Sequence, residues 1–167
     1  MLSPAEVDAL SAAAAISPTA AFEAIQAVAA RRLGASLVTA MRYDAPNATV
    51  ERLYSSNPAA YPVGGRKLKR DTDWSRQVLV EKRVLVCAGD DAIRAAFDDH
   101  AVILGLGIHS IVNVPLVSGS RCLGTLNVSR GRTDWTDEDI ALVRMLGMTA
   151  LAAVLAIVLA AMPGFRR

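Results

Sequence analysis

Two cysteines and two histidines are the residues of this chain with the widest range of possible chemistry. A cysteine nucleophile needs a nearby base, and Cys87 and His100 could form such a pair. Cys87, however, ends the apolar run Val84–Cys87, which is typical of a buried and unreactive thiol. We expect Cys122 to be exposed, because it adjoins a tight turn, and only Arg121 beside it would lower its pKa. A thiol enzyme that uses Cys87 or Cys122 is therefore an alternative hypothesis and not the leading one.

Metal and nucleic-acid binding have little support in the sequence. A metal site needs three or four converging ligands, and we interpret His100 and His109 as hydrogen-bonding residues, so we expect no metal and require no cofactor. The net charge of +2 predicts no nucleic-acid partner. One basic run stands out, Arg66–Arg70, with four cations in five residues. We interpret it as a solvated loop; the alternative is a site for phosphate or carboxylate.

Aromatic and polar side chains within apolar segments are better candidates for chemistry. Pocket walls combine apolar and aromatic groups with a few placed polar ones, and a buried polar group needs a partner. The Leu-Gly-Leu-Gly stretch after His100 would allow that histidine to lie beside a cavity. We therefore predict that an unidentified small molecule is bound by Tyr54, Tyr61, Trp74, Phe97, His100, Asn113 and Asn127.

The elements that must position these residues are clearest in Ile108–Arg130. Two apolar, β-branched runs flank Ser-Gly-Ser-Arg, which is typical of an antiparallel hairpin. A tight turn there would place Val117 opposite Cys122 and Asn113 opposite Leu126. Because both faces of this hairpin are apolar, we expect other layers to cover both of them.

The remaining segments predict a single domain over residues 1–167. Ser3 and Ser17, each followed by proline, begin two helices, and Gly34 ends the second. Alternating apolar residues predict further strands, whereas Pro58–Gly65 is irregular because prolines and glycines interrupt it. The predicted parts are N-terminal helices in 1–34, strands at 36–43, 49–56 and 84–87 within a sheet and pocket segment in 35–135, and a C-terminal helix in 136–162.

The C-terminal helix has no charge between Met145 and Met162, a length near the lower limit for a membrane span. It is rich in alanine, which favours insertion weakly, and it begins as a capped surface helix at Thr136. We therefore expect a cytoplasmic protein that does not insert into a membrane. Small residues at four-residue spacing allow helices to approach closely. We predict a homodimer through Gly147, Leu151, Ala152, Leu155, Ala156, Leu159 and Ala160.

Three motifs in chain order resemble the GAF domain family: Ser-Ile-Val-Asn-Val-Pro at 110–115, Gly-Thr-Leu-Asn at 124–127 and Trp-Thr-Asp-Glu-Asp at 135–139. The resemblance covers about residues 18–162. It implies an α+β fold in α/β/α layers, with a central antiparallel sheet of roughly five to six strands. An N- and C-terminal helical bundle would cover one face, and a pocket layer of short helices and loops the other. It also implies a non-catalytic sensor that signals through a helical dimer or a separate partner.

The chain departs from the ligand-specific patterns of this family. Only Phe97 and Asp98 are similar to the Asn-Lys-Phe-Asp-Glu set of members that bind cyclic nucleotides. No chromophore-attachment motif accompanies Cys87. Free methionine-R-sulfoxide reductases carry a His-x-x-Cys-Asp-like run where this chain has His-Ala-Val-Ile at 100–103. A thiol-dependent redox enzyme similar to these reductases is the alternative function, and the sequence does not identify the ligand.

Overall fold

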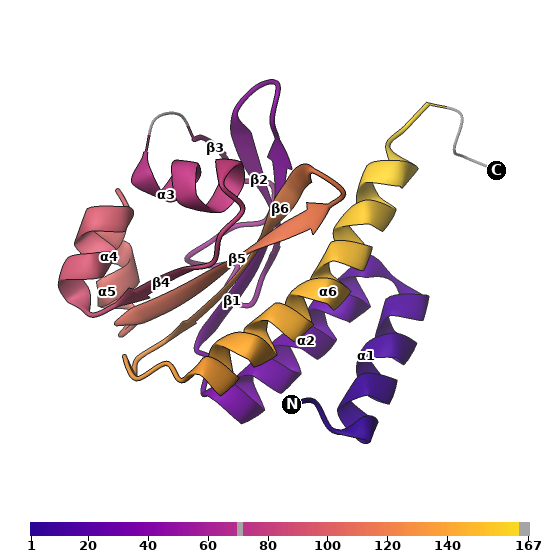
Figure 1. Cartoon of the computed structure of the whole chain (residues 1–167), viewed down its shortest axis with the longest axis horizontal. Helices are drawn as coiled ribbons and strands as arrows, with labels where there is room; N and C mark the ends of the chain where they lie inside the picture. The colour runs from indigo at the N-terminus through magenta and orange to yellow at the C-terminus, as the bar shows by residue number, and fades with distance from the viewer. Residues whose placement is uncertain (70–71, 164–167) are drawn as a thin grey trace.

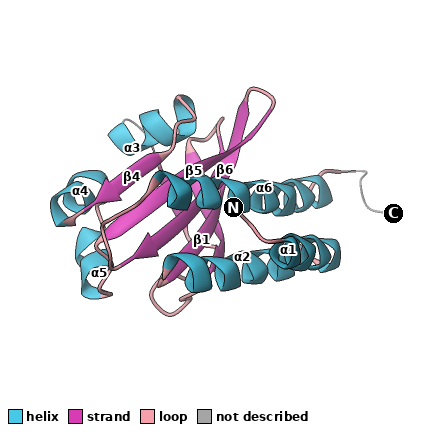
Figure 2. Cartoon of the chain, turned by 60° about the horizontal axis from the view of Figure 1, so that its bottom comes forward, coloured by secondary structure: helices cyan, strands magenta, loops and turns pink. Residues whose placement is uncertain are grey.

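The computed structural model describes residues 1–69 and 72–163, so Arg70 of the basic run lies outside the described residues. It contains a six-stranded sheet in the order β3-β2-β1-β6-β5-β4, in which every neighbouring pair is antiparallel. Figures 1 and 2 show helices on both faces of this sheet. The predicted α+β architecture, with a helical bundle on one face and short helices on the other, is confirmed.

The helices and strands follow the predicted order, with a short edge strand added. The helices are α1 (Pro4–Ile16), α2 (Pro18–Leu33), α3 (Asp73–Ser75), the π-helical turn η1 (Arg76–Val80), α4 (Asp90–Ala96), α5 (His100–Gly105) and α6 (Asp137–Ala160). The strands are β1 (Leu37–Asp44), β2 (Thr49–Ser55), β3 (Arg66–Leu68), β4 (Leu85–Ala88), β5 (Ser110–Ser118) and β6 (Arg121–Arg130).

Capping residues set the limits of the long helices. The Ser3 hydroxyl accepts a hydrogen bond from the Glu6 amide, and the Glu6 carboxylate accepts one from the Ser3 amide. The Ser17 hydroxyl caps α2 by accepting a hydrogen bond from the Ala20 amide, and Gly34 ends this helix with a φ of 64°. This positive φ favours glycine, which has no Cβ to clash.

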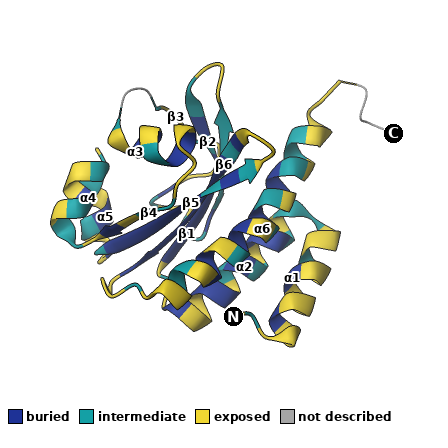
Figure 3. Ribbon diagram, viewed as in Figure 1, coloured by how far each residue is buried: buried dark blue, intermediate teal, exposed yellow. Residues whose placement is uncertain are grey.

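Helices α1, α2 and α6 cover one face of the sheet, and the main core lies between them and β1, β5 and β6. Figure 3 shows that α6 turns its buried side to the sheet. By length and composition alone, α6 could cross a bilayer, as can core helices of other folds. Its stripe of Leu142, Leu146, Ala150 and Val154 is buried in this core, so α6 is part of the folded domain.

The hairpin of β5 and β6 has a different register from the predicted one. Val117 lies opposite Cys122, as predicted, but Asn113 lies opposite Asn127 and not opposite Leu126. A β-bulge near the turn shifts the pairing by one residue. Because successive side chains on a strand point to opposite faces, the bulge places Asn113 and Asn127 on the same face.

The bulge lies where β6 passes close to β1. Leu116 pairs with Gly124, which leaves Leu123 as the extra residue of β6. A Cβ on Gly124 would overlap the carbonyl oxygen of Met41, so only glycine fits this contact without movement of the backbone.

Arg66–Leu68 of the basic run is exposed, as expected, but it forms the edge strand β3 and not a loop. Lys67 pairs with Val50 of β2, and Arg66 pairs with Glu51. The Arg66 guanidinium lies 3.2 Å from the Glu51 carboxylate. Strand alternation therefore separates Arg66 from Lys67, which points to the opposite face of the sheet.

Candidate functional site

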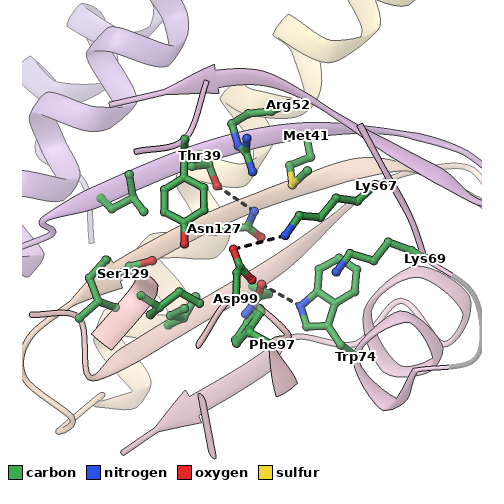
Figure 4. Close-up of a pocket in the computed structure, with 16 residues that line it drawn as sticks. Thr39, Met41, Arg52, Lys67, Lys69, Trp74, Phe97, Asp99, Asn127 and Ser129 are labelled. Carbon is green, nitrogen blue, oxygen red and sulfur yellow. Dashed lines mark hydrogen bonds and ion pairs between the residues drawn. The ribbon is translucent and has the colours of Figure 1, made fainter. Parts of the chain in front are cut away.

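A cavity of about 80 Å³ lies between the sheet and the layer of α3, α4, α5 and residues 57–65. A single water needs only about 10–15 Å³ of such space, so the cavity has room for a compact organic molecule. Figure 4 shows its walls. The lining residues are Leu37, Thr39, Met41, Arg52, Tyr61, Lys67, Lys69, Trp74, Phe97, Asp99, Ile103, Ile108, Ile111, Asn113, Asn127 and Ser129.

Strand alternation and helix capping explain how these side chains come together. Every second residue of β1, from Leu37 to Met41, faces the cavity. Trp74 lies in the first turn of α3, which begins where the Thr72 hydroxyl accepts a hydrogen bond from the Ser75 amide. Five residues predicted from the sequence to bind a ligand surround this one cavity, and their binding role stays a prediction: Tyr61, Trp74, Phe97, Asn113 and Asn127.

The two other predicted residues do not line the cavity. Tyr54 lies against the helical bundle, where it stacks on Phe22 with ring centroids 5.4 Å apart and donates a hydrogen bond to Gln26. His100 is half-buried in the first turn of α5. Tyr54 differs from the expectation because an aromatic side chain in a strand can serve either face of the sheet. His100 differs because it lies in the first turn of a helix, whose cavity-lining residue is Ile103.

Two buried amides form the polar centre of the cavity. Asn113 is 1% exposed, and its Oδ1 accepts a hydrogen bond of 3.0 Å from Trp74 Nε1. Asn127 Nδ2 donates to Thr39 Oγ1 at 3.0 Å. Within the described part of the chain, Asn113 Nδ2 and Asn127 Oδ1 have no hydrogen-bond partner. A buried polar atom without a partner costs about 1–3 kcal/mol, so a molecule that pairs with these atoms is favoured.

A second polar group lies where β2 meets the irregular segment. The guanidinium of Arg52 stands 4.9 Å from the centre of the Tyr61 ring and donates a 3.0 Å hydrogen bond to the Pro62 carbonyl. Arg52 Nε and the Tyr61 hydroxyl lack partners among residues 1–69 and 72–163. Burial and the nearby Asp99 carboxylate raise the pKa of Tyr61 above its usual value. The hydroxyl therefore stays protonated and can donate a hydrogen bond.

An ion pair joins two walls of the cavity. Lys67 of β3 extends toward Asp99, and its Nζ lies 3.3 Å from the Asp99 carboxylate (Figure 4). Burial alone would raise the pKa of Asp99, but the Lys67 ammonium and hydrogen bonds lower it overall. Asp99 is the N-cap residue of α5, yet its side chain does not cap that helix. The Asp99 carboxylate is thus committed to the cavity.

Lys69 provides a further positive charge. Its Nζ lies 4.8 Å from the centre of the Trp74 ring (Figure 4). Burial and the neighbouring Lys67 lower the pKa of Lys69. A cation over an aromatic face is attracted to the ring, by about 0.5–2 kcal/mol.

The predicted ligand-binding residues omit four charged residues of the site: Arg52, Lys67, Lys69 and Asp99. Lys67 and Lys69 belong to the basic run, for which an anion site is the alternative interpretation from the sequence. A period-two interpretation of the basic run would have placed Lys67 and Lys69 on one face. No local pattern marks Arg52 or Asp99, because their positions depend on the pairing of β2 and on the start of α5.

The cysteines are unsuited to thiol chemistry. Cys87 is 2% exposed within a cluster of apolar residues, and burial raises its pKa to about 11. Cys122 is 7% exposed, which corrects the expectation of an exposed thiol, and burial raises its pKa too. Neither lines the cavity. At neutral pH, both sulfurs are therefore protonated and poor nucleophiles.

The predicted dimer residues form part of the outer side of α6, with one exception. Gly147 is buried, and a Cβ there would lie 3.2 Å from Val114 of β5. It therefore faces the sheet and cannot contribute to an outer surface. The other residues predicted for this surface are half-exposed or exposed: Leu151, Ala152, Leu155, Ala156, Leu159 and Ala160.

The GAF domain family matches residues 17–154, and the chain belongs to this family. The GAF domain of a phosphoenolpyruvate-protein phosphotransferase from Acinetobacter is similar in structure, with a TM-score of 0.70, 15% identity, and coverage of 98% of this chain and 99% of that one. A segment of a methyl-accepting chemotaxis protein is also similar, with a TM-score of 0.65, 17% identity, and coverage of 91% of this chain and 98% of that one. The GAF domain of a two-component sensor histidine kinase from Bacillus halodurans has a TM-score of 0.65 and 14% identity, and the match covers 84% of this chain and 97% of that one.

At these identities, the similarity establishes the fold and not the ligand. Comparison of the sequence with curated proteins gives no match. Among the structural relatives are a methyl-accepting chemotaxis protein and a two-component sensor histidine kinase.

Proposed function

We propose that this GAF domain is a non-catalytic sensor that binds a small molecule in the cavity beneath α3, α4 and α5. The observation that carries the proposal is an apolar cavity with four polar atoms that lack partners in the described chain, on Arg52, Tyr61, Asn113 and Asn127. Ligand pockets typically combine apolar walls with a few such groups. The buried, protonated cysteines disfavour the thiol-dependent alternative.

Signal transfer would use the sheet as a shared wall. On β5, Asn113 faces the cavity, and its neighbour Val114 contacts α6 at Gly147. Movement of β5 on ligand binding would therefore reach α6 directly. These contacts connect the cavity to α6. They can carry a signal only if β5 has two conformations and the ligand favours one of them.

The outer side of α6 is the proposed interface of a cytoplasmic homodimer. It exposes apolar residues and has no charge between Met145 and Ala160, and Met148 is 73% exposed. An uncovered apolar stripe of this kind is favourable to bury against a second copy. Leu155 and Ala156 lie near its centre, and a separate signalling partner would then respond to the dimer.

Native mass spectrometry of freshly purified protein tests ligand binding. We expect a retained small molecule that is lost in Asn127→Leu and kept in Arg66→Met, a control on the opposite face. The proposal would be contradicted if the mass spectrum showed only the protein without a ligand and if no compound of a metabolite library raised its thermal midpoint. Replacing both cysteines with alanine is expected to leave the retained molecule in place.

Light scattering tests the dimer. We expect Ala156→Glu to give monomers or insoluble protein, because it introduces a charge into the apolar stripe. Ala95→Glu introduces the same charge at an exposed alanine of α4, on the other face of the sheet, and is the matched control. An unchanged soluble dimer of Ala156→Glu would show that this interface is wrong.

A further inference from the structure

We propose that the ligand is a compact organic carboxylate with an apolar body, which competes with Asp99 for the cations of the cavity. This inference rests on the proposed function, because it names the chemical class of ligand for the same cavity. Four observations carry it: an excess of cations, hydrogen-bond donors without partners among the described residues, an internal carboxylate paired with one of the cations, and an apolar wall.

The cavity carries more positive than negative charge. Arg52, Lys67 and Lys69 line it, and Asp99 is the acidic residue among the described lining residues. The Lys67–Asp99 pair neutralises one cation, which leaves two positive charges in a partly buried space. Charges in such surroundings are weakly screened, so an anion gains more there than on the open surface.

The polar atoms without partners also favour an acceptor-rich ligand. Arg52 Nε, the Tyr61 hydroxyl and Asn113 Nδ2 can each donate a hydrogen bond, whereas Asn127 Oδ1 accepts. A carboxylate has about four acceptor positions and no donor when ionised. It therefore pairs with donors that a neutral hydrocarbon or an ammonium ligand would leave unmatched.

Asp99 shows that the site already holds a carboxylate. Its side chain reaches Lys67 across the cavity and does not cap α5. A ligand carboxylate of the same chemistry would use the same ammonium group, so the two are competitors for Lys67. Removal of the Asp99 charge should then strengthen binding of the ligand, which a site built for a cation would not show.

The rest of the cavity wall is apolar and selects the body of the ligand. Leu37, Met41, Phe97, Ile103 and Ile111 line it together with the Trp74 ring. The space of about 80 Å³ suits a compact body such as one ring or a short branched chain. Burial of this body away from water favours binding.

Benzoate and its neutral isostere benzamide test the charge preference. Isothermal titration calorimetry of the whole chain should show benzoate binding at least about tenfold tighter than benzamide, since a charge-assisted pair is worth more than a neutral one. The indole N–H resonance of Trp74 should shift with benzoate, which reports binding in the cavity. Inorganic phosphate, which lacks an apolar body, should bind about tenfold more weakly than benzoate.

Three variants locate the preference. Lys69→Met should weaken benzoate about tenfold and leave benzamide unchanged, whereas Asp99→Asn should strengthen benzoate by about fivefold. Arg66→Met removes a cation from the same strand on the opposite face, and it should change neither constant. The gain expected for Asp99→Asn cannot come from a misfolded protein, and thermal unfolding checks the other two variants.

The outcomes separate this inference from the proposed function. Equal binding of benzoate and benzamide would overturn the anion preference and leave a small-molecule sensor in place. Tighter binding of benzylamine, or weaker binding of benzoate to Asp99→Asn, would also overturn it. If none of these probes binds, the carboxylate class is wrong, and native mass spectrometry then decides on the sensor itself.

Discussion

The two faces of the central sheet are built for different purposes. The face toward α2 and α6 is closed, because Val38, Val112 and Leu126 pack against apolar helix residues and the Tyr54 hydroxyl on this face is hydrogen-bonded to Gln26. The face toward the short helices contains amides, cations and a carboxylate beside a cavity. Successive side chains of a strand point to opposite faces of the sheet. In β1, β5 and β6, one residue therefore packs in the core and the next lines the cavity.

The largest predicted effect is on the closed face. Leu146 is 0% exposed in the core between α6 and the sheet. Leu146→Ala should lower the free energy of unfolding by about 2–5 kcal/mol, because it removes buried methyl groups and leaves a cavity. Urea denaturation measures this change. A loss below about 1 kcal/mol would mean that the closed face is not tightly packed.

A smaller effect of opposite sign is expected on the cavity face. Thr125 is fully buried, and its hydroxyl has no hydrogen-bond partner within residues 1–69 and 72–163. Thr125→Val keeps the shape and removes this unsatisfied group, so the free energy of unfolding should rise by about 1 kcal/mol. The same urea experiment measures it. A clear loss of stability would show that the hydroxyl is hydrogen-bonded in solution.

A pH-dependent effect is expected at α1, which polar contacts hold on the closed side. Glu6 accepts hydrogen bonds from Ser3, Arg31 and Arg32, and these lower its pKa from 4.5 to about 2. Glu6 therefore stabilises the fold fully above about pH 4.5, and this contribution disappears as the pH falls through about 2. The difference in thermal midpoint between wild type and Glu6→Gln should shrink over that range. A constant difference would contradict the assignment.

Much of the fold follows from local patterns in the sequence. Serine caps, a helix-ending glycine and period-two apolar runs mark the long helices and five of the strands, because each signal depends on residues close in the chain. The resemblance to the GAF family then predicts how these elements are arranged in layers. The short strand β3 was missed because three residues with two cations have no apolar alternation, and pairing with β2 alone makes them a strand.

The candidate site was less predictable than the fold. Tyr61, Trp74 and Phe97 were found as aromatic residues near the pocket segment, but Tyr54 has the same composition signal and lies on the closed face. Which face a residue serves depends on register. The pairing of Asn113 with Asn127 depends on a bulge that no local pattern announces.

That bulge also determines how the cavity can change over evolutionary time. The extra residue Leu123 sets which residues of β6 lie above the sheet and which lie below it. Loss of one residue at this turn would exchange Asn127 for an aliphatic neighbour without any substitution along the strand. A deletion in the β5–β6 hairpin would therefore change the polarity of the cavity wall more than any single substitution in β6.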